Sequence, residues 1–302
     1  ATQGVTTSGS EVTEWVDQAS GYLASQTNSG TRPTYQPGMN GLNNIRFDGI
    51  DDFLSIPHED PLNLEQNEDF EIFTVMDCSN PTAGPPDGYP VIYGKGRLEN
   101  NDFLLYVALN TYRVRFGNRM SVVAPNDQNT GDNLGWVRRQ GNSGFLYNTI
   151  GGSSSSSGVA NAQMNGNPHN VTIGSAEDGT VRFFQGDIAE IILIKRALTT
   201  DERLKTEGYL AHKWGLADEL PDGHPYKAES AVIDANVDSR AQLIVGGDII
   251  QDLSDNTLTE NGVNLYKFSA DTANFANLIL TNPGVNEFIN NSGPAPRLWK
   301  LT

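Results

Sequence analysis

Three carboxylates, Asp48, Asp51 and Asp52, lie close together in the segment FDGIDDF at 47–53. Carboxylate oxygens suit Ca²⁺, but this ion requires about six to eight converging oxygens. Asp and Gly also supply the left-handed backbone and the side-chain-to-backbone hydrogen bonds of a tight turn. We favour a structural turn over a metal site here, and we name these three residues as the ligands to test if calcium binds.

Aromatic side chains and arginines on the middle strands form a second candidate site. A pyranose presents C–H patches and hydroxyls, so it is recognised by aromatic faces together with planar polar side chains. Alternation separates Arg113 and Arg115 from the apolar positions around them, so we expect both arginines to face solvent or a groove. Tyr106 and Trp136 could equally be core, and the arginines could simply be solvated on an outer face. The candidate ligand-binding residues are Tyr93, Tyr106, Arg113, Arg115, Trp136 and Arg138.

Patterns typical of catalysis are missing from the sequence. There is no G-x-S-x-G segment, and the four histidines show no metal-ligand spacing. The single cysteine, Cys78, excludes an internal disulfide. We therefore predict no catalytic residues, although a lyase that uses scattered Tyr and Arg residues stays open.

These candidates need a sheet to position them, and period-two alternation dominates the first 200 residues. We predict strands around 45–48, 52–56, 68–77, 90–96, 102–110, 112–118, 170–174, 181–186 and 187–196, and a hairpin over 135–152 with its turn at 141–144. Many short strands with almost no helix between them predict an all-β antiparallel sandwich or jelly roll. We interpret the insert GGSSSSSG at 151–158 as a flexible surface loop.

One helix is predicted near the end of this region. Thr199 and Glu202 form a T-x-x-E capping box, and Gly215 is well placed to end the helix. A segment rich in Pro and Gly follows. We place a domain boundary near Lys227, so that 1–227 is the sandwich and 228–302 is a small β-rich module that docks against it.

The composition limits the partners. The chain has 20 Lys and Arg against 37 Asp and Glu, a formal charge of −17, which repels phosphate backbones and disfavours nucleic acid. No apolar run reaches about 18 residues, so we predict no transmembrane helix and no membrane insertion. The N-terminus carries no basic-then-apolar stretch, so an export signal has been removed or was never there.

Three segments, in this order, resemble the bacterial laminin-G-like, concanavalin A-like lectin/glucanase domains. They are TTSGSEVTEWVDQASG with SGTRPTYQPGMNGLNNIRFDGIDDFLSI, then FFQGDIAEIILIKRALTTDER, then GYLAHKWGLADELPDGHPY. The resemblance covers about 4–226 and implies a sandwich of one concave and one convex sheet with a single helix near its end. Relatives begin with a further strand upstream of the match to Gln3–Thr6. We therefore expect a piece of a longer polypeptide, with a shorter natural variant as the alternative.

The resemblance also bears on the chemistry. The segment at 47–53 is similar to the family's FDG-x-DDY hairpin, and relatives carry an Asp where Ala189 stands, which argues against calcium. The glucanase relatives place their paired carboxylates in E-x-D-x-x-E, whereas the nearest segment here puts Glu68 and Glu71 on opposite faces. The resemblance assigns His212 and His224 to a structural strap.

Two functions of different classes follow. The first is a non-catalytic carbohydrate-binding or adhesion module of a secreted, cell-surface or virion protein, whose partner is a glycan or polysaccharide. The second is a structural assembly component, such as a tail, fibre or decoration protein, whose partners are neighbouring protein subunits. A polysaccharide-active enzyme comes third.

Overall fold

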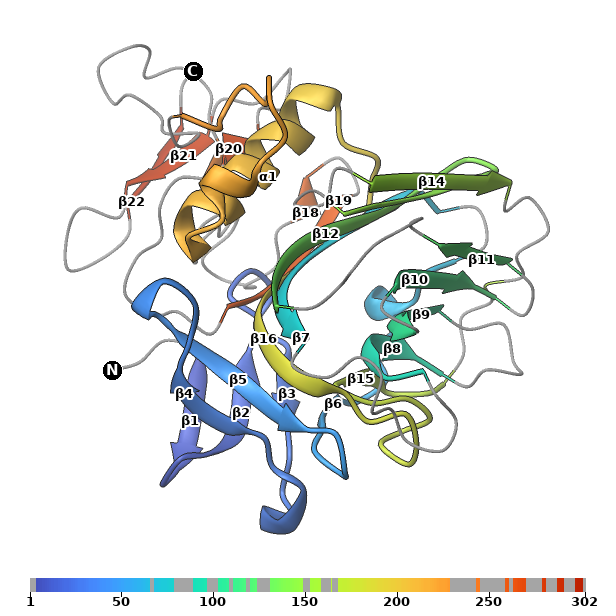
Figure 1. Cartoon of the computed structure of the whole chain (residues 1–302), viewed down its shortest axis with the longest axis vertical. Helices are drawn as coiled ribbons and strands as arrows, with labels where there is room; N and C mark the ends of the chain where they lie inside the picture. Colours follow the sequence, from blue (N-terminus) through green and yellow to red (C-terminus); the bar gives the residue numbers. More distant parts are fainter. Residues whose placement is uncertain are drawn as a thin grey trace.

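The computed structural model is an antiparallel β-sandwich with one α-helix on its outer side (Figure 1). It describes residues 4–65, 68–78, 89–96, 103–108, 111–117, 120–123, 131–148, 153–158, 164 and 168–228, and the backbone of six short strands beyond them. One layer is strongly curved and wraps around the other. The all-β sandwich predicted from the alternation is confirmed.

The strands of the sandwich are β1 (Val5–Ser8), β2 (Glu11–Val16), β3 (Leu23–Ser25), β4 (Thr34–Pro37), β5 (Asn43–Asp48), β6 (Leu54–Ile56), β7 (Phe70–Cys78), β8 (Val91–Lys95), β9 (Phe103–Ala108), β10 (Thr111–Phe116), β11 (Met120–Val123), β12 (Gly131–Gln140), β13 (Ser143–Asn148), β14 (Ser153–Gly158), β15 (Val171–Ile173) and β16 (Gln185–Ile194). The helix α1 is Thr200–Trp214. Short 3-10 turns lie at Ser29–Thr31, Met39–Gly41, Asp60–Leu62 and Ala217–Glu219. The later strands are β17 (Leu243–Ile244), β18 (Thr259–Glu260), β19 (Val263–Ser269), β20 (Ile279–Leu280), β21 (Glu287–Asn290) and β22 (Arg297–Lys300).

The curved layer runs β14-β13-β12-β7-β16-β5, and the second layer runs β6-β15-β8-β9-β10-β11. The first four strands join the layers, because β4 pairs with β5 and β3 pairs with β6. The hairpin predicted over 135–152 is present, with Trp136 opposite Tyr147. Strands β9 and β10 form a second hairpin, in which Thr111 lies opposite Ala108 and the connecting residues 109 and 110 lie outside the described residues.

The core lies between the layers, and alternation along β7 shows which face is which. The Phe70 ring packs against Phe103 of β9 and Phe116 of β10, with ring centroids 5.4 and 6.1 Å apart. The next residue, Glu71, points the other way and accepts a hydrogen bond from the Leu198 N–H beside α1. The curved layer therefore has a core face and a helix face. Trp15 and Trp214 are both buried in the core cluster.

The serine-rich insert is a strand, so its interpretation as a loop was wrong. Ser153–Gly158 forms β14, which pairs with β13 from Ser143↔Gly158 to Asn148↔Ser153. The ladder hydrogen bonds come from the backbone, and β13 supplies a neighbouring strand whatever the inserted side chains are. A polar composition alone therefore does not identify a loop beside a strong hairpin.

Helix α1 begins and ends as predicted. The Thr199 hydroxyl accepts from the Glu202 N–H while the Glu202 carboxylate accepts from the Thr199 N–H, and Gly215 ends the helix at φ +77°. The helix is anchored to β16 through the fully buried Glu190. Its carboxylate accepts from Trp214 Nε1 at 2.8 Å and pairs with Lys213 Nζ at 3.1 Å.

The segment after residue 227 contributes to the sandwich. β19 pairs with Glu190–Ile194 of β16, and β5 pairs with Gln185–Ile188 along the same edge. The other described C-terminal strands pair among themselves as β17–β20 and β21–β22, with β18 beside β19. The boundary near Lys227 remains a prediction. Within the described residues, no helix has the length and apolar character needed to span a membrane.

Candidate functional site

A group of tyrosines and arginines lies on the outer face of the second layer. Along β9, Phe103, Leu105 and Val107 belong to the main core, whereas Leu104 and Tyr106 belong to a separate apolar cluster on the opposite face. Arg113 lies directly opposite Tyr106, and Arg115 lies opposite Leu104. Directly opposite residues of an antiparallel pair share a face. The structure therefore brings together three of the predicted residues, Tyr106, Arg113 and Arg115.

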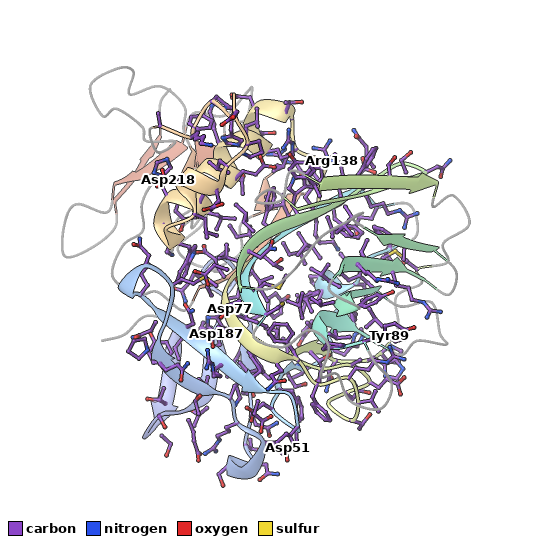
Figure 2. The ribbon with its side chains drawn as sticks, viewed as in Figure 1. Asp51, Asp77, Tyr89, Arg138, Asp187 and Asp218 are labelled. Carbon is purple, nitrogen blue, oxygen red and sulfur yellow. The ribbon has the colours of Figure 1, made fainter. Side chains whose placement is uncertain are left out.

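Two further residues that the sequence analysis missed extend this group. Tyr89 packs edge-on against Tyr106 with ring centroids 5.6 Å apart, and its side chain is 40% exposed. The Arg182 guanidinium lies 5.1 Å from the centre of the Tyr89 ring. We call Tyr89, Tyr106, Arg113, Arg115 and Arg182 the tyrosine–arginine patch. In Figure 2, Tyr89 lies on the outer side of the second layer, and Arg138 lies beside the helix, well separated from Tyr89.

The loop that carries Arg182 has an unusual backbone. Glu177, Asp178 and Arg182 have φ of +53°, +58° and +61°, and among the described residues only Asn40 is a further non-glycine with positive φ. Left-handed backbone in such residues costs about 1–3 kcal/mol each and concentrates at functional sites. The loop is held in place from both ends: Val91 N–H donates to the Arg182 carbonyl at 2.9 Å, and the Asp178 carboxylate pairs with His169 at 2.9 Å. These contacts hold the backbone of the loop at Arg182, and the guanidinium packs on the Tyr89 ring.

Tyr93 does not belong to the patch. Its side chain is 2% exposed and packs against Phe103 inside the sandwich, and burial raises the pKa of its hydroxyl. An irregularity in the β8–β9 pairing between Val91 and Tyr93 places Val91 on the outer face and Tyr93 on the core face. Tyr93 is therefore a core residue of the sandwich and lies apart from the patch.

Trp136 and Arg138 lie on the opposite side of the molecule, on the helix face of the curved layer. The Trp136 ring is 8% exposed and has two guanidiniums over it, Arg138 at 5.5 Å and Arg203 at 5.2 Å. Arg138 Nε donates to Glu71 at 2.7 Å, and its Nη2 donates to the Leu198 carbonyl at 2.7 Å. The structure gives both residues a packing role and separates them from the patch.

The acidic turn is closed by its own hydrogen bonds. Asp48 Oδ1 accepts from the N–H groups of Ile50 and Asp51, and Asp52 Oδ2 accepts from the Asp48 N–H at 2.9 Å. Gly49 has φ +78°, and a Cβ there would lie 2.7 Å from Gln185 Cβ. The candidate ligand oxygens of the three carboxylates lie within 4.8 Å of one another. Burial, and then the nearby Asp48 carboxylate, raises the pKa of Asp52 to about 7. The turn is thus established, and calcium binding by these three residues remains a proposal.

A structural turn makes a specific prediction about these carboxylates. Asp48→Ala removes the acceptor of two backbone N–H groups, so we expect it to lower the free energy of unfolding by about 1–2 kcal/mol. The matched change Asp51→Ala should have a much smaller effect, because the Asp51 carboxylate accepts none of these three turn hydrogen bonds. Urea unfolding of both variants with calcium and with EDTA checks this. A calcium-dependent gain in the parent chain that Asp51→Ala abolishes would instead establish a metal site.

A second group of carboxylates crosses the curved layer. Asp77 of β7 lies opposite Asp132 of β12 and opposite Asp187 of β16, and Figure 2 shows Asp77 and Asp187 close together. Arg46 donates two hydrogen bonds to Asp187, at 2.7 and 2.6 Å. Burial, and then the neighbouring carboxylates, raises the pKa of Asp77 and of Asp132. Sequence spacing gave no sign of this row, because its members come from three strands.

The carboxylates and histidines singled out by the sequence are engaged within the chain. Glu68 pairs with Lys195 at 2.8 Å, and Glu71 pairs with Arg138. His212 Nε2 donates to the Tyr226 carbonyl at 2.8 Å. The other contacts are His224 with Glu207, His169 with Asp178, and His58 with Lys95. These contacts give each side chain a structural partner.

No family model and no curated protein matches this chain. Among solved structures it is similar to the binding domain of Paraclostridial Mosquitocidal Protein 1, at TM-score 0.44 and 11% identity over 60% of this chain and 48% of that one. It is also similar to the CBM40 of the Ruminococcus gnavus IT-sialidase (TM-score 0.39, 14% identity, 45% and 81% covered) and to the Trypanosoma rangeli sialidase (TM-score 0.45, 15% identity, 65% and 30% covered). The chain thus spans about half the length of the first of these domains. At such identities and TM-scores the likenesses carry no conclusion about function.

Proposed function

We propose that this chain is a non-catalytic carbohydrate-binding module of the laminin-G-like type, carried by a secreted, cell-surface or virion protein, and that a glycan binds at the tyrosine–arginine patch. The observation that carries the proposal is the half-exposed Tyr89 ring, held between the Tyr106 ring and the Arg182 guanidinium. An aromatic surface beside fixed planar donors matches the C–H patches and hydroxyls of a pyranose.

The supporting residues make the patch rigid. Tyr106 is mostly buried in the outer apolar cluster with Val91, Leu104 and Ala176, so it supports Tyr89 and leaves most of the contact with a ligand to it. The loop that carries Arg182 is held by the Val91 N–H and by the pair between Asp178 and His169. A rigid site loses little conformational entropy when a ligand binds. The patch thus combines an exposed ring with donors that are already in place.

Tyr89→Ala is the variant that tests this proposal. Losing the ring should weaken glycan binding by roughly tenfold, because aromatic contacts of this kind contribute about 0.5–1.5 kcal/mol beyond their buried area. The measurement is a glycan array with and without EDTA, followed by calorimetry on the strongest hit. Tyr147→Ala, a half-buried tyrosine on the helix face, is the matched control. Equal binding by the Tyr89 variant, or an array without hits, would contradict the proposal.

A second candidate function is assembly with neighbouring subunits, and the edge strand β14 favours it. Its six residues are serines and a glycine, and among the described strands it forms a ladder with β13 alone. Uncharged edge strands lack the lysines that discourage pairing between molecules. Light scattering tests this candidate. A monomer that binds glycans supports the first function, and self-assembly with a silent array supports the second.

A further inference from the structure

We infer that the ligand of the tyrosine–arginine patch is an anionic saccharide, one that carries a carboxylate or sulfate group; this inference rests on the proposed function. Arg113 and Arg115 alternate on one strand, and Arg182 reaches the same face from a separate loop. Tyr89 and Tyr106 connect them, since Arg182 lies over Tyr89, Tyr89 packs on Tyr106, and Tyr106 is opposite Arg113. Three arginines thus lie on the face that carries this aromatic pair, with the Arg182 guanidinium over the Tyr89 ring.

The residue types on this face differ from those of the rest of the chain. The chain has 37 acidic and 20 basic residues, yet the described strand positions on this face hold no acidic residue. By register, the described positions on this face include Val91, Gly94, Leu104, Tyr106, Arg113 and Arg115. On the loop that carries Arg182, the two carboxylate oxygens of Asp178 are engaged by His169 and by the Asn170 N–H. The opposite layer carries the row Asp77, Asp132 and Asp187 on its helix face.

Guanidinium chemistry selects the ligand class. A planar guanidinium matches a carboxylate or sulfate group with two parallel hydrogen bonds, and such charge-assisted bonds are roughly twice as strong as neutral ones. A neutral sugar offers hydroxyls, for which amide and hydroxyl side chains would serve equally well. A chain of formal charge −17 disfavours anions at most of its surface. A face with three arginines and no acidic strand position is where an anionic sugar can bind.

The experiment is an array of matched pairs that share a sugar backbone and differ in charge. The pairs are sialylated and desialylated oligosaccharides, oligouronates and their methyl esters, and sulfated and desulfated glycans. We expect hits on the charged members, with at least roughly tenfold weaker binding of the neutral partners. The uronate and sialic acid arms identify a carboxylate ligand, and the sulfated arm identifies a sulfate ligand.

The double variant Arg113→Gln/Arg182→Gln then tests the position of the site on the strongest hit. It should remove the preference for the charged member while melting at the same temperature as the parent chain. Lys205→Gln, which removes one positive charge from the exposed side of α1, is the control and should leave the preference unchanged. Hits that are equal on both members of a pair, or a double variant that keeps its preference, would overturn the inference and leave glycan binding intact. An array with no hits would instead overturn the proposed function.

Discussion

Replacing Glu190 by leucine should lower the free energy of unfolding by about 3–5 kcal/mol, the loss expected when a buried ion pair loses one partner. Glu190 is fully buried and holds three groups of α1 against β16. Trp214 Nε1 donates to it at 2.8 Å, the Tyr209 hydroxyl donates at 3.3 Å, and Lys213 pairs with it at 3.1 Å. The leucine would leave the buried Lys213 ammonium and the Trp214 N–H without this acceptor.

The double variant Glu190→Leu/Lys213→Met separates charge from packing. Replacing both members of a buried pair by apolar residues of similar size is often close to neutral, so the double variant should recover much of the loss. Urea unfolding of the two single variants and the double variant provides the cycle. A single Glu190→Leu variant as stable as the double variant would show that the ion pair does not anchor the helix.

The second large effect concerns Arg138, whose role should depend on pH. Arg138→Met removes the cation that faces the fully buried Glu71, so we expect a loss of about 3 kcal/mol at pH 8. Burial raises the pKa of Glu71 to about 7, against the opposing effects of Arg138 and the Leu198 N–H. Without Arg138 the carboxyl is protonated more readily. At pH 5 the variant should therefore lose clearly less stability than at pH 8.

The sign of this pH dependence follows from the direction of the pKa shift. Because the folded pKa of Glu71 lies above its ordinary value of 4.5, Glu71 contributes stability that is complete below 4.5 and is lost as pH rises through about 7. Asp52, Asp77 and Asp132 have raised pKa values and act in the same direction. The parent chain should thus be more stable at pH 5 than at pH 8. Glu71→Gln should flatten this difference, and an unchanged slope in that variant would contradict the assignment.

Local signals in the sequence predicted much of the fold. The strand Phe70–Cys78 and the β12–β13 hairpin follow from alternation, and α1 follows from the capping box at Thr199 together with Gly215. Each of these signals lies within a few residues of the feature it determines. The strand at 153–158 was missed because its pairing depends on the neighbour β13 and its own side chains show no alternation.

The candidate site was predicted only in part, because its residues meet through tertiary contacts. Alternation placed Arg113 and Arg115 correctly on an outer face, and register adds Tyr106 to them. Arg182 reaches Tyr89 from a loop about ninety residues later, through a left-handed backbone that its sequence does not signal. Alternation did not decide the positions of Tyr93 and Trp136, because an aromatic residue in an alternating strand fits a core face and an exposed face equally well.

Hydrogen–deuterium exchange, measured with and without the strongest array hit at saturation, tests most directly whether the outer face of the second layer is the binding face. We predict slower exchange in β8, β9 and β10 and in the loop at 174–184, with no change at the acidic turn or in α1. Slower exchange confined to β12, β13 and the start of α1 would place the ligand beside Trp136 and Arg138 and would contradict this account.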